Sequence, residues 1–338
     1  MRAPIYSNWG FCAGILLGLC VGLSCARTDR ANVAPPEMAG AAPGPVNGVR
    51  PGDPELGGES HEAGSQLAVG QELSKGAGIN PAVVEREPLA GAGARFVAAG
   101  VDGAFIVRQR GRADRVYGDR RVDERRQPCS TFKLANALIA LEEGVVSGVD
   151  MSLPWDGVER WLAPWNRDHD LRSAMKFSVV WYFQELARRI GEPAMERWLG
   201  VLEYGDRRIG DSVDSFWLEG PLSISAAEEL EFVDRLVDGS LPVSERSLSL
   251  VRSIVPGRTY GRASIRAKTG TCVYEDGRTP HAWLVGWVER DGAPIGSFAL
   301  LLVKGANVNA LVDVRWSLAA RLLADAGLLD ASALAAAG

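Results

Sequence analysis

Apolar residues recur every three or four positions in four segments of the chain, and this spacing predicts a helix in each. The four segments are residues 130–146, 179–190, 226–237 and 312–326. Ser225 and Glu228 have the spacing of a capping box, so they predict where the third helix begins. Gly144 and Gly191 favour an end to the first and second helices.

Short apolar runs predict strands on both sides of these helices. Residues 96–99 and 104–107 predict two strands joined by a turn at residues 100–103, and residues 264–267, 282–288 and 297–303 predict three more. Because strands at both ends flank the helices, we expect one sheet built from both termini, with a helical insert. The predicted fold class is α/β, of the α+β kind.

The N-terminus has the pattern of an export signal. Arg2 supplies a positive charge, residues 11–23 are apolar, and small residues surround Cys25. Residues 1–26 are therefore predicted to be a signal peptide, and the protein to be periplasmic or secreted. Cys25 leaves a second interpretation open, a lipoprotein anchored through that cysteine, because the residues before it partly resemble a lipobox. An uncleaved membrane anchor is the third.

Residues 27–86 are rich in Pro, Gly, Ala and Glu and show no hydrophobic period. Such a segment cannot bury enough apolar surface to fold, so it is predicted to be a flexible linker. The folded domain is then expected over residues 87–330.

Composition and charge lower the odds of several classes of function. The net charge of −5 gives no electrostatic reason to expect nucleic-acid binding. The three histidines do not stand at metal-ligand spacing, so neither a stable metal nor a histidine-based triad is expected. Only five of the 37 basic residues are lysine, and two of the five lie in the motifs described next.

S-T-F-K at residues 130–133 is the central candidate for chemistry. Residues three apart at the start of a helix share a face, so the Ser130 hydroxyl and the Lys133 amine can meet. A serine hydroxyl is a weak nucleophile until a neighbouring base takes its proton. Backbone N–H groups at a helix N-terminus can also bind an acyl oxygen. Alone, the motif is common by chance.

K-T-G at residues 268–270 strengthens this interpretation. It falls in a predicted strand, where Gly270 is expected to let a substrate amide approach the backbone closely. S-x-x-K followed by K-T-G resembles the pairing found in penicillin-binding proteins and β-lactamases. The order of the two motifs along this chain is the expected one.

Further segments resemble one class of β-lactamase in particular. S-V-V at residues 178–180 resembles the S-x-V of class D, and F-W-L-E-G at residues 216–220 resembles its W-x-x-G. Y-G-D at residues 204–206 resembles its Y-G-N, with Asp206 in place of asparagine. Over residues 96–328 the chain therefore resembles the class D, or oxacillinase-type, serine β-lactamases.

The resemblance implies the serine β-lactamase/D,D-peptidase fold, in which helices and a helical lobe flank an antiparallel sheet. It implies hydrolysis of β-lactams such as penicillins and oxacillin through an acyl-enzyme on Ser130. Lys133, if buried among apolar residues, loses its proton readily. In class D enzymes this lysine is carboxylated by carbon dioxide and is the general base for acylation and deacylation. Trp217 is expected to donate a hydrogen bond to that carboxylate, and no other cofactor is implied.

The resemblance also implies roles at other positions. Ser178 is expected to pass a proton to the β-lactam nitrogen, and Lys268 to supply positive potential. The backbone N–H groups of Ser130 and Thr271 are expected to form the oxyanion hole. The residues expected to bind the substrate or to shape its pocket are Thr269, Gly270, Thr271, Val180, Leu218 and Arg315.

Two positions leave alternatives open. Arg315 is expected to bind the substrate carboxylate, but Arg321 is a rival and a solvated helix arginine is the alternative. Asp206 either alters the substrate range or faces solvent.

Cys129 and Cys272 are the two cysteines outside the signal region. One precedes the expected nucleophile and the other lies two residues past K-T-G, so the two motifs bring them near each other. Some class A carbapenem-hydrolysing enzymes resemble this arrangement and join the two positions by a disulfide. Export to an oxidising compartment favours that bond, and two buried free thiols are the alternative.

Other functions fit some of the same motifs. A penicillin-binding protein or D,D-peptidase shares S-x-x-K and K-T-G, and a β-lactam sensor domain shares the class D motifs without turnover. A non-catalytic binding protein is the alternative from another class. The expected partners are small β-lactam substrates. The protein is expected to be a monomer or a homodimer.

Overall fold

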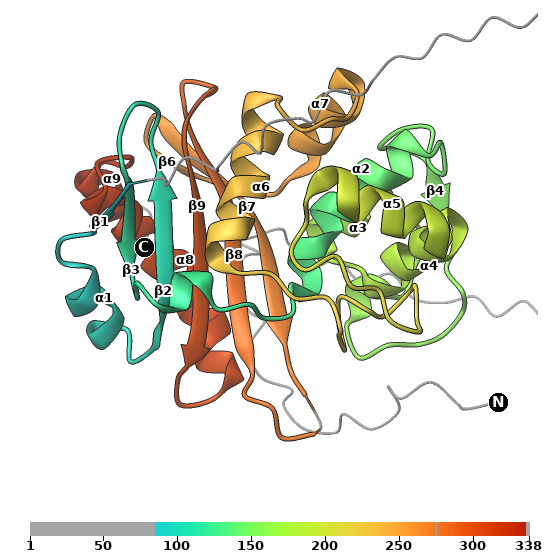
Figure 1. The fold of residues 1–338 in the computed structure, drawn as a ribbon, viewed down its shortest axis with the longest axis horizontal. Coiled ribbons are helices and arrows are strands. Elements are labelled where there is room, and N and C mark those ends of the chain that lie inside the picture. The colour runs from blue at the N-terminus through green and yellow to red at the C-terminus, as the bar shows by residue number, and fades with distance from the viewer. Residues whose placement is uncertain (1–84, 275, 336–338) are drawn as a thin grey trace, which may run out of the picture. The chain divides into compact units, whose positions relative to one another are not determined.

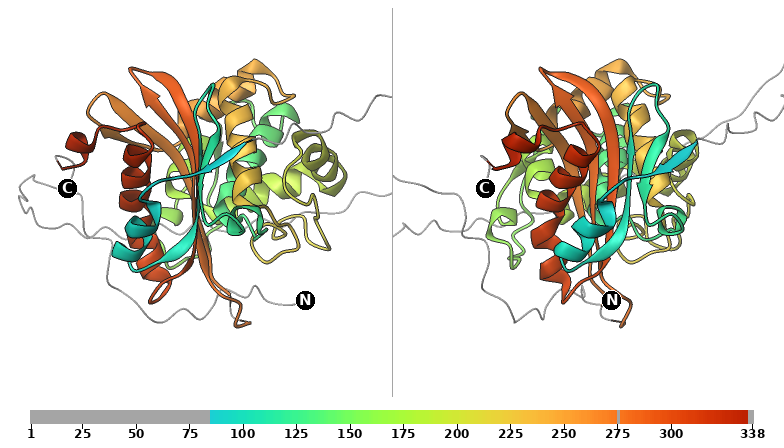
Figure 2. Two further views of the ribbon diagram at one scale, coloured as in Figure 1. Left: turned by 60° about the vertical axis from the view of Figure 1, so that its left-hand side comes forward. Right: turned by 90° about the vertical axis from the view of Figure 1, so that its left-hand side faces the viewer.

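A sheet of seven strands separates two layers of helices (Figures 1 and 2). The computed structural model describes residues 85–274 and 276–335. The strand order is β1-β3-β2-β9-β8-β7-β6, and all neighbours are antiparallel except β1 and β3. The strands are β1 (Arg86–Pro88), β2 (Asp102–Arg108), β3 (Asp114–Tyr117), β6 (Gly257–Tyr260), β7 (Ala263–Cys272), β8 (His281–Arg290) and β9 (Ala293–Lys304).

Most helices lie between β3 and β6 in the chain. The α-helices are α1 (Ala92–Ala98), α2 (Lys133–Glu142), α3 (Leu171–Phe177), α4 (Val180–Ile190), α5 (Glu192–Leu202), α6 (Ala226–Asp238), α7 (Glu245–Ile254), α8 (Val308–Asp325) and α9 (Ala331–Ala335). The short elements are the 3-10 helices η1 (Arg121–Asp123), η2 (Cys129–Phe132) and η3 (Ala163–Trp165), and the strand pair β4 (Ser152–Leu153) and β5 (His169–Asp170).

Helix α6 packs on one face of the sheet, against β2, β8 and β9, and the lobe of α2 to α5 lies beside it (Figure 1). Helices α8 and α1 cover the opposite face (Figure 2). Side chains of β8 are buried without a break from His281 to Val288, because both faces of this central strand are covered. The sheet is therefore the shared wall of two hydrophobic cores.

The main expectations for the fold are confirmed. Both ends of the described chain contribute strands to one sheet, with the helices inserted between them. The four predicted helices correspond to η2 with α2, to α4, to α6 and to α8. The Ser225–Glu228 capping box is present, with Glu228 N–H donating to Ser225 Oγ at 3.2 Å and Ser225 N–H donating to Glu228 Oε2 at 2.9 Å.

The strand predicted over residues 96–99 is wrong, because these residues belong largely to helix α1. Ala92 and Phe96, four residues apart, are buried, whereas Val97 is 80% exposed. That is the spacing of a helix face, and Phe96 stacks on Tyr117 with ring centroids 4.2 Å apart. An apolar run of four residues is too short to separate the two periods. Strands β1, β3 and β6, the short pair β4 and β5, and helices α3, α5, α7 and α9 were not predicted.

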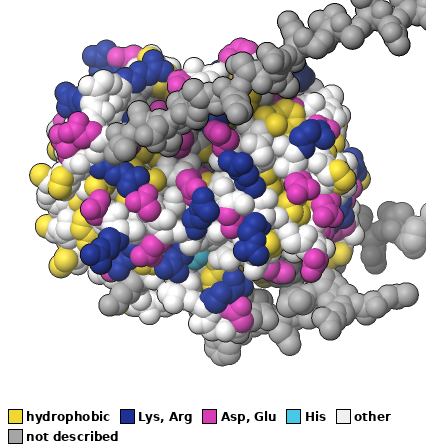
Figure 3. Space-filling view, viewed as in Figure 1, with side chains coloured by type: hydrophobic (Ala, Val, Ile, Leu, Met, Phe, Trp, Pro, Cys, Tyr) yellow, Lys and Arg dark blue, Asp and Glu magenta, His cyan; other side chains and the backbone are white. Residues whose placement is uncertain are grey.

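The predicted signal peptide, Cys25 included, lies outside the described residues. So does the predicted linker except for its last two residues, of which Arg86 is already part of β1. Within the described ranges no helix is long and apolar enough to cross a membrane, and no cluster of three or more His, Cys, Asp or Glu could hold a metal. Charged side chains of both signs are mixed over the visible surface (Figure 3).

Candidate active site

Ser130 lies in the 3-10 turn η2, which leads directly into helix α2. Cys129, just before it, has a left-handed backbone with φ of 49°, and its N–H donates to Trp217 O at 2.9 Å. A non-glycine residue in this region is strained and needs support from its surroundings. The helical geometry brings Lys133 Nζ to 3.0 Å from Ser130 Oγ, as the S-T-F-K spacing predicts.

Lys133 is fully buried in the first turn of α2. Its Nζ lies 2.6 Å from Ser178 O, 3.0 Å from Ser178 Oγ and 5.5 Å from the centre of the Phe183 ring. Burial, and to a lesser degree the charge of Lys268, holds the pKa of Lys133 well below its usual range. A neutral amine next to a serine hydroxyl can accept a proton or react as a nucleophile.

Ser178 connects the two lysines of the site. It ends helix α3 with a left-handed backbone, φ 54°, which turns the chain sharply before α4. Its Oγ lies 3.0 Å from Lys133 Nζ and 2.9 Å from Lys268 Nζ. Burial, followed by the charge of Arg315, lowers the pKa of Lys268 to about 7. The four polar groups form one chain, from Ser130 through Lys133 and Ser178 to Lys268.

The K-T-G strand β7 packs against the turn that carries Ser130. A side chain at Gly270 would place its Cβ 2.8 Å from Pro128 O and 3.1 Å from the Trp283 side chain. The sequence predicted that this glycine makes room for a substrate. The structure gives a different reason, because the turn itself occupies the space that a side chain needs. Thr269 is half-buried and Thr271 is exposed.

Cys129 and Cys272 form a disulfide, with their Cα atoms 5.8 Å apart. This distance lies in the usual range for the bond. The disulfide ties the turn before Ser130 to the end of β7, two residues past the K-T-G motif. The strained Cys129 backbone therefore has a covalent support.

Trp217 is fully buried between Phe132 and Phe216, with ring centroids 5.2 and 5.0 Å away. Its indole N–H has no hydrogen-bond partner among the described residues. A buried donor without an acceptor is costly, so this N–H is available to an acceptor that the described residues do not supply. Leu218 and Val180, which were expected to shape the pocket, are both partly buried.

Arg315 reaches the K-T-G strand from helix α8. Its Nη1 donates to Thr271 Oγ1 at 3.0 Å and to Gly270 O at 3.2 Å. Burial, then the charge of Arg258, lowers its pKa to about 10. Arg321, in contrast, is exposed. Of the two arginines, Arg315 is the one that the fold places beside the predicted substrate-binding residues.

Asp206 takes part in local structure and does not simply face solvent. Its Oδ2 accepts a hydrogen bond from Ser223 Oγ at 2.7 Å, and its Oδ1 accepts one from Ser223 N–H at 3.0 Å. Its own N–H donates to Ser223 O at 2.9 Å. The residue therefore joins the loop after Tyr204 to the segment that leads into α6.

Three buried polar residues beside the nucleophile were given no role by the sequence, although two of them stand in the motifs S-T-F-K and Y-G-D: Thr131, Tyr204 and Glu229. Thr131 Oγ1 lies 2.5 Å from Glu229 Oε1, and Tyr204 OH lies 3.1 Å from the same oxygen. A signal existed in the sequence, because Glu229 lies on the apolar face of its helix, between Ala226 and Val233. A second missed contact is that of Trp165, whose Nε1 donates to Phe177 O at 2.9 Å, next to Ser178.

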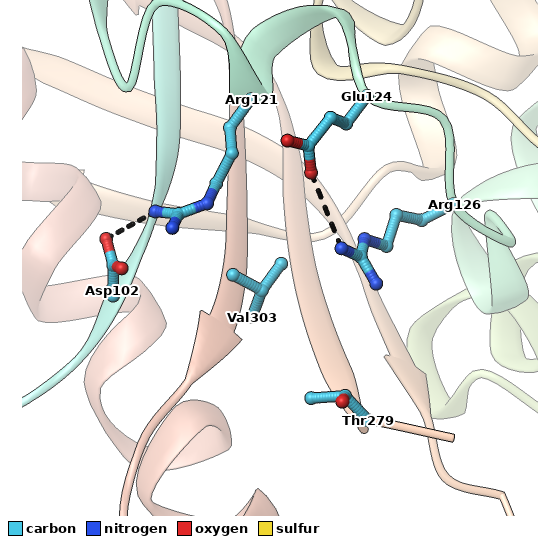
Figure 4. A pocket seen from close by; sticks show the side chains of 6 residues that line it. All are labelled: Asp102, Arg121, Glu124, Arg126, Thr279 and Val303. Atoms are coloured by element: carbon cyan, nitrogen blue, oxygen red, sulfur yellow. Dashed lines mark hydrogen bonds and ion pairs between the residues drawn. The ribbon is translucent and has the colours of Figure 1, made fainter.

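A pocket of about 370 Å³ lies elsewhere on the surface (Figure 4). Its charged side chains neutralise one another, since Arg121 pairs with Asp102 at 2.6 Å and Arg126 with Glu124 at 3.4 Å. None of its lining residues is a predicted site residue. This pocket is therefore separate from the predicted site residues.

Comparison with known proteins identifies relatives of the whole domain. The model of the penicillin-binding protein transpeptidase domain matches residues 102–310. The chain is 46% identical to β-lactamase OXA-48 of Klebsiella pneumoniae over 164 residues, which are 48% of this chain and 61% of that protein. It is 33% identical to β-lactamase OXA-19 of Pseudomonas aeruginosa over 236 residues, which are 69% of this chain and 88% of the relative.

Solved structures agree. The class D β-lactamase YbXI from Nostoc superimposes with a TM-score of 0.66 at 34% identity, over 70% of this chain and 99% of that one. FUS-1 (OXA-85), a class D β-lactamase from Fusobacterium nucleatum subsp. polymorphum, gives 0.66 at 32% identity, over 71% and 98%. The predicted fold is therefore confirmed.

Proposed function

This chain belongs to the class D β-lactamases, within the penicillin-binding protein transpeptidase family, and from that premise we propose that it hydrolyses β-lactam antibiotics through a covalent acyl-enzyme on Ser130. One observation carries the proposal. A chain of polar groups runs from Ser130 through Lys133 and Ser178 to Lys268, with every step at 2.9–3.0 Å and both lysines buried. Such a chain can remove a proton from the nucleophile and return one to a leaving group.

In acylation, Ser130 Oγ attacks the β-lactam carbonyl carbon, and the ring C–N bond breaks. The backbone N–H groups of Ser130 and Thr271 bind the oxyanion, each contributing roughly 10²–10³ in rate. Ser178 passes a proton to the departing nitrogen, because its hydroxyl lies within reach of both lysines. Lys268, Thr269 and Arg315 hold the substrate carboxylate. In deacylation, water attacks the ester carbonyl and Ser130 is released.

Carboxylation of Lys133 by carbon dioxide fits the surroundings of this residue. Its amine is buried and its pKa is well below the usual range, which favours the neutral form that reacts with carbon dioxide. The buried Trp217 N–H lacks an acceptor, which a carboxylate on this lysine would provide. The bound group would supply the general base for both acylation and deacylation. Val180 and Leu218 limit the access of water to it.

The protein is proposed to act after export, in the periplasm, at the cell surface through Cys25, or outside the cell. The pattern of residues 1–26 supports this, and so does the disulfide, which persists in an oxidising compartment. The domain over residues 87–330 is proposed to be the catalytic unit.

The test combines turnover with labelling. The purified protein is expected to hydrolyse nitrocefin over many cycles, and intact-mass measurement is expected to find a transient adduct of one penicillin that Ser130→Ala abolishes. A stable adduct without turnover would instead indicate a penicillin-binding protein or a sensor. The absence of both turnover and adduct would indicate a binding protein and would overturn the proposal.

A further inference from the structure

Glu229 is a fully buried carboxyl group that contacts Thr131, the residue after the proposed nucleophile Ser130. Its Oε1 lies 2.5 Å from Thr131 Oγ1, and Thr131 follows Ser130 directly in the chain. Thr131 Oγ1 also lies 2.9 Å from Pro128 O, on the other side of Ser130. The hydroxyl of Thr131 therefore bridges Glu229 to the backbone of the turn that presents Ser130.

Whether Glu229 is protonated or ionised follows from the hydroxyl and carboxyl protons available in this cluster. Thr131 has a single hydroxyl proton but two oxygen neighbours, and Pro128 O can only accept. If Thr131 donates to Pro128 O, then the bond between Thr131 and Glu229 needs a proton on Glu229. An ionised Glu229 would draw the Thr131 proton to itself, and Pro128 O would lose this donor.

The rest of the cavity also disfavours a charge on Glu229. Its Oε2 has no hydrogen-bond partner in the described part of the chain, which an ionised carboxylate tolerates poorly. No cation pairs with it there. The titratable groups that face it are Tyr204, whose hydroxyl lies 3.1 Å from Oε1, and its neighbour Glu228, which is paired with Arg125.

We propose that Glu229 is a positioning residue that acts as a neutral carboxylic acid, donating to Thr131 so that Thr131 can hold Pro128 O and fix the turn that carries Ser130. Ionisation of Glu229 breaks this relay and loosens the nucleophile, so activity falls as the pH rises. The inference rests on the proposed function of Ser130 and adds a control on its position.

The direction of the pKa shift agrees with the geometry. Burial raises the pKa of Glu229 to about 7, and its hydrogen bonds with Thr131 and Tyr204 only partly oppose this. The unfolded chain releases the same proton near its ordinary pKa of about 4.3. The folded protein should therefore lose stability as the pH rises between these two values, and the loss should be complete above the higher one.

Three single variants, one double variant and a control test the relay. Glu229→Gln keeps a donor toward Thr131 at every pH, Glu229→Leu removes it, and Thr131→Val removes the bridge. Glu231→Gln is the matched control, since it deletes a half-exposed carboxylate two residues along the same helix. For each variant, kcat and KM for nitrocefin and the thermal midpoint are measured from about pH 5.5 to about pH 8.5. Infrared spectra report the carbonyl band of a protonated acid.

The ratio of kcat in Glu229→Gln to kcat in the wild type should be near one at the acidic end and rise about five- to tenfold about one pH unit above the wild-type midpoint. KM should change little. Because Lys268 titrates in both proteins, its effect on kcat cancels in this ratio. The acid carbonyl band should be absent from Glu229→Gln and present in Glu231→Gln.

Glu229→Leu and Thr131→Val should each lower kcat at all pH values, and the double variant should lose no more than either, because both break one relay. A flat kcat ratio, a missing acid band in the wild type, or additive losses would overturn the proposal. A wild type without β-lactam turnover would instead reject the proposed function. The infrared band and the pH dependence of stability would still decide the state of Glu229.

Discussion

The two faces of the sheet bury different kinds of residue. Toward α8 and α1 the core is apolar, with residues such as Phe105, Leu284 and Leu300 fully buried. Apart from Arg315 of α8, whose Nε is buried, the buried polar and charged side chains of the described residues lie on the α6 side or in the lobe beside it: Asp114, Thr131, Lys133, Asn136, His169, Ser225, Glu229, Ser247, Lys268, His281 and Ser297.

The apolar face therefore contributes mainly to stability, and the polar face carries the groups for chemistry. Burying a polar group costs free energy unless it is fully paired, and several groups on the α6 side are not: Asn136 Oδ1, Trp217 Nε1 and Glu229 Oε2 lack partners. The apolar face offsets such costs, because its burial is favourable without any pairing. Substitutions on the two faces should therefore affect different properties of the protein.

The largest expected effect is on the polar face. Ser130→Ala removes the nucleophile, so nitrocefin hydrolysis should fall about 10⁴- to 10⁶-fold. Little volume is lost, and the free energy of unfolding should change by less than about 1 kcal/mol. Kinetics and a melting curve on the same preparation check both. Near-normal turnover would contradict the serine mechanism.

The reverse effect is expected on the apolar face. Leu300→Ala opens a cavity in β9 at a fully buried position and should lower the free energy of unfolding by about 2–5 kcal/mol, with kcat unchanged where the protein stays folded. Denaturant titration measures the loss. Val97→Ala is the control, since Val97 is 80% exposed and should hardly matter. A large fall in kcat for Leu300→Ala would break the contrast between the faces.

Loss of the disulfide should lower both stability and activity. Replacing both Cys129 and Cys272 by alanine should lower the free energy of unfolding by about 2–4 kcal/mol, since the bond closes a long loop. It should also lower kcat, because the strained turn before Ser130 loses its tie to β7. Melting curves of the oxidised and reduced wild type give an independent measure. Equal stability in the two redox states would count against this role.

The smallest expected effect sharpens the contrast within the polar face. Trp217→Phe removes the indole N–H and little packing, so kcat should fall about 10- to 100-fold if that donor binds a charged group. The pKa of Lys133 is lowered, so its amine is neutral above that pKa and protonated as the pH falls through it.

Acid treatment should therefore remove carbon dioxide from Lys133 and abolish activity, and bicarbonate at neutral pH should restore it. Activity assays with and without bicarbonate check this. Indifference to bicarbonate, together with normal activity in Trp217→Phe, would exclude the carboxylated lysine.

The sequence by itself determined the sheet from both termini, the four main helices and the family. It did so because amphipathic periods and short motifs are local, and local spacing specifies which side chains share a helix face. Ser130 and Lys133 are three residues apart, so their contact follows from helix geometry alone. Helix α1 was missed because four apolar residues show no distinct period.

Only the tertiary structure decided the contacts between distant segments. The approach of Gly270 to Pro128 O, the choice of Arg315 over Arg321, the binding of Ser223 by Asp206 and the burial of Glu229 against Thr131 each join residues far apart in the chain. Such contacts depend on how whole elements pack, and a burial-driven pKa exists only once that packing excludes water. The sequence places a carboxyl group on an apolar helix face, but only the fold buries it and raises its pKa.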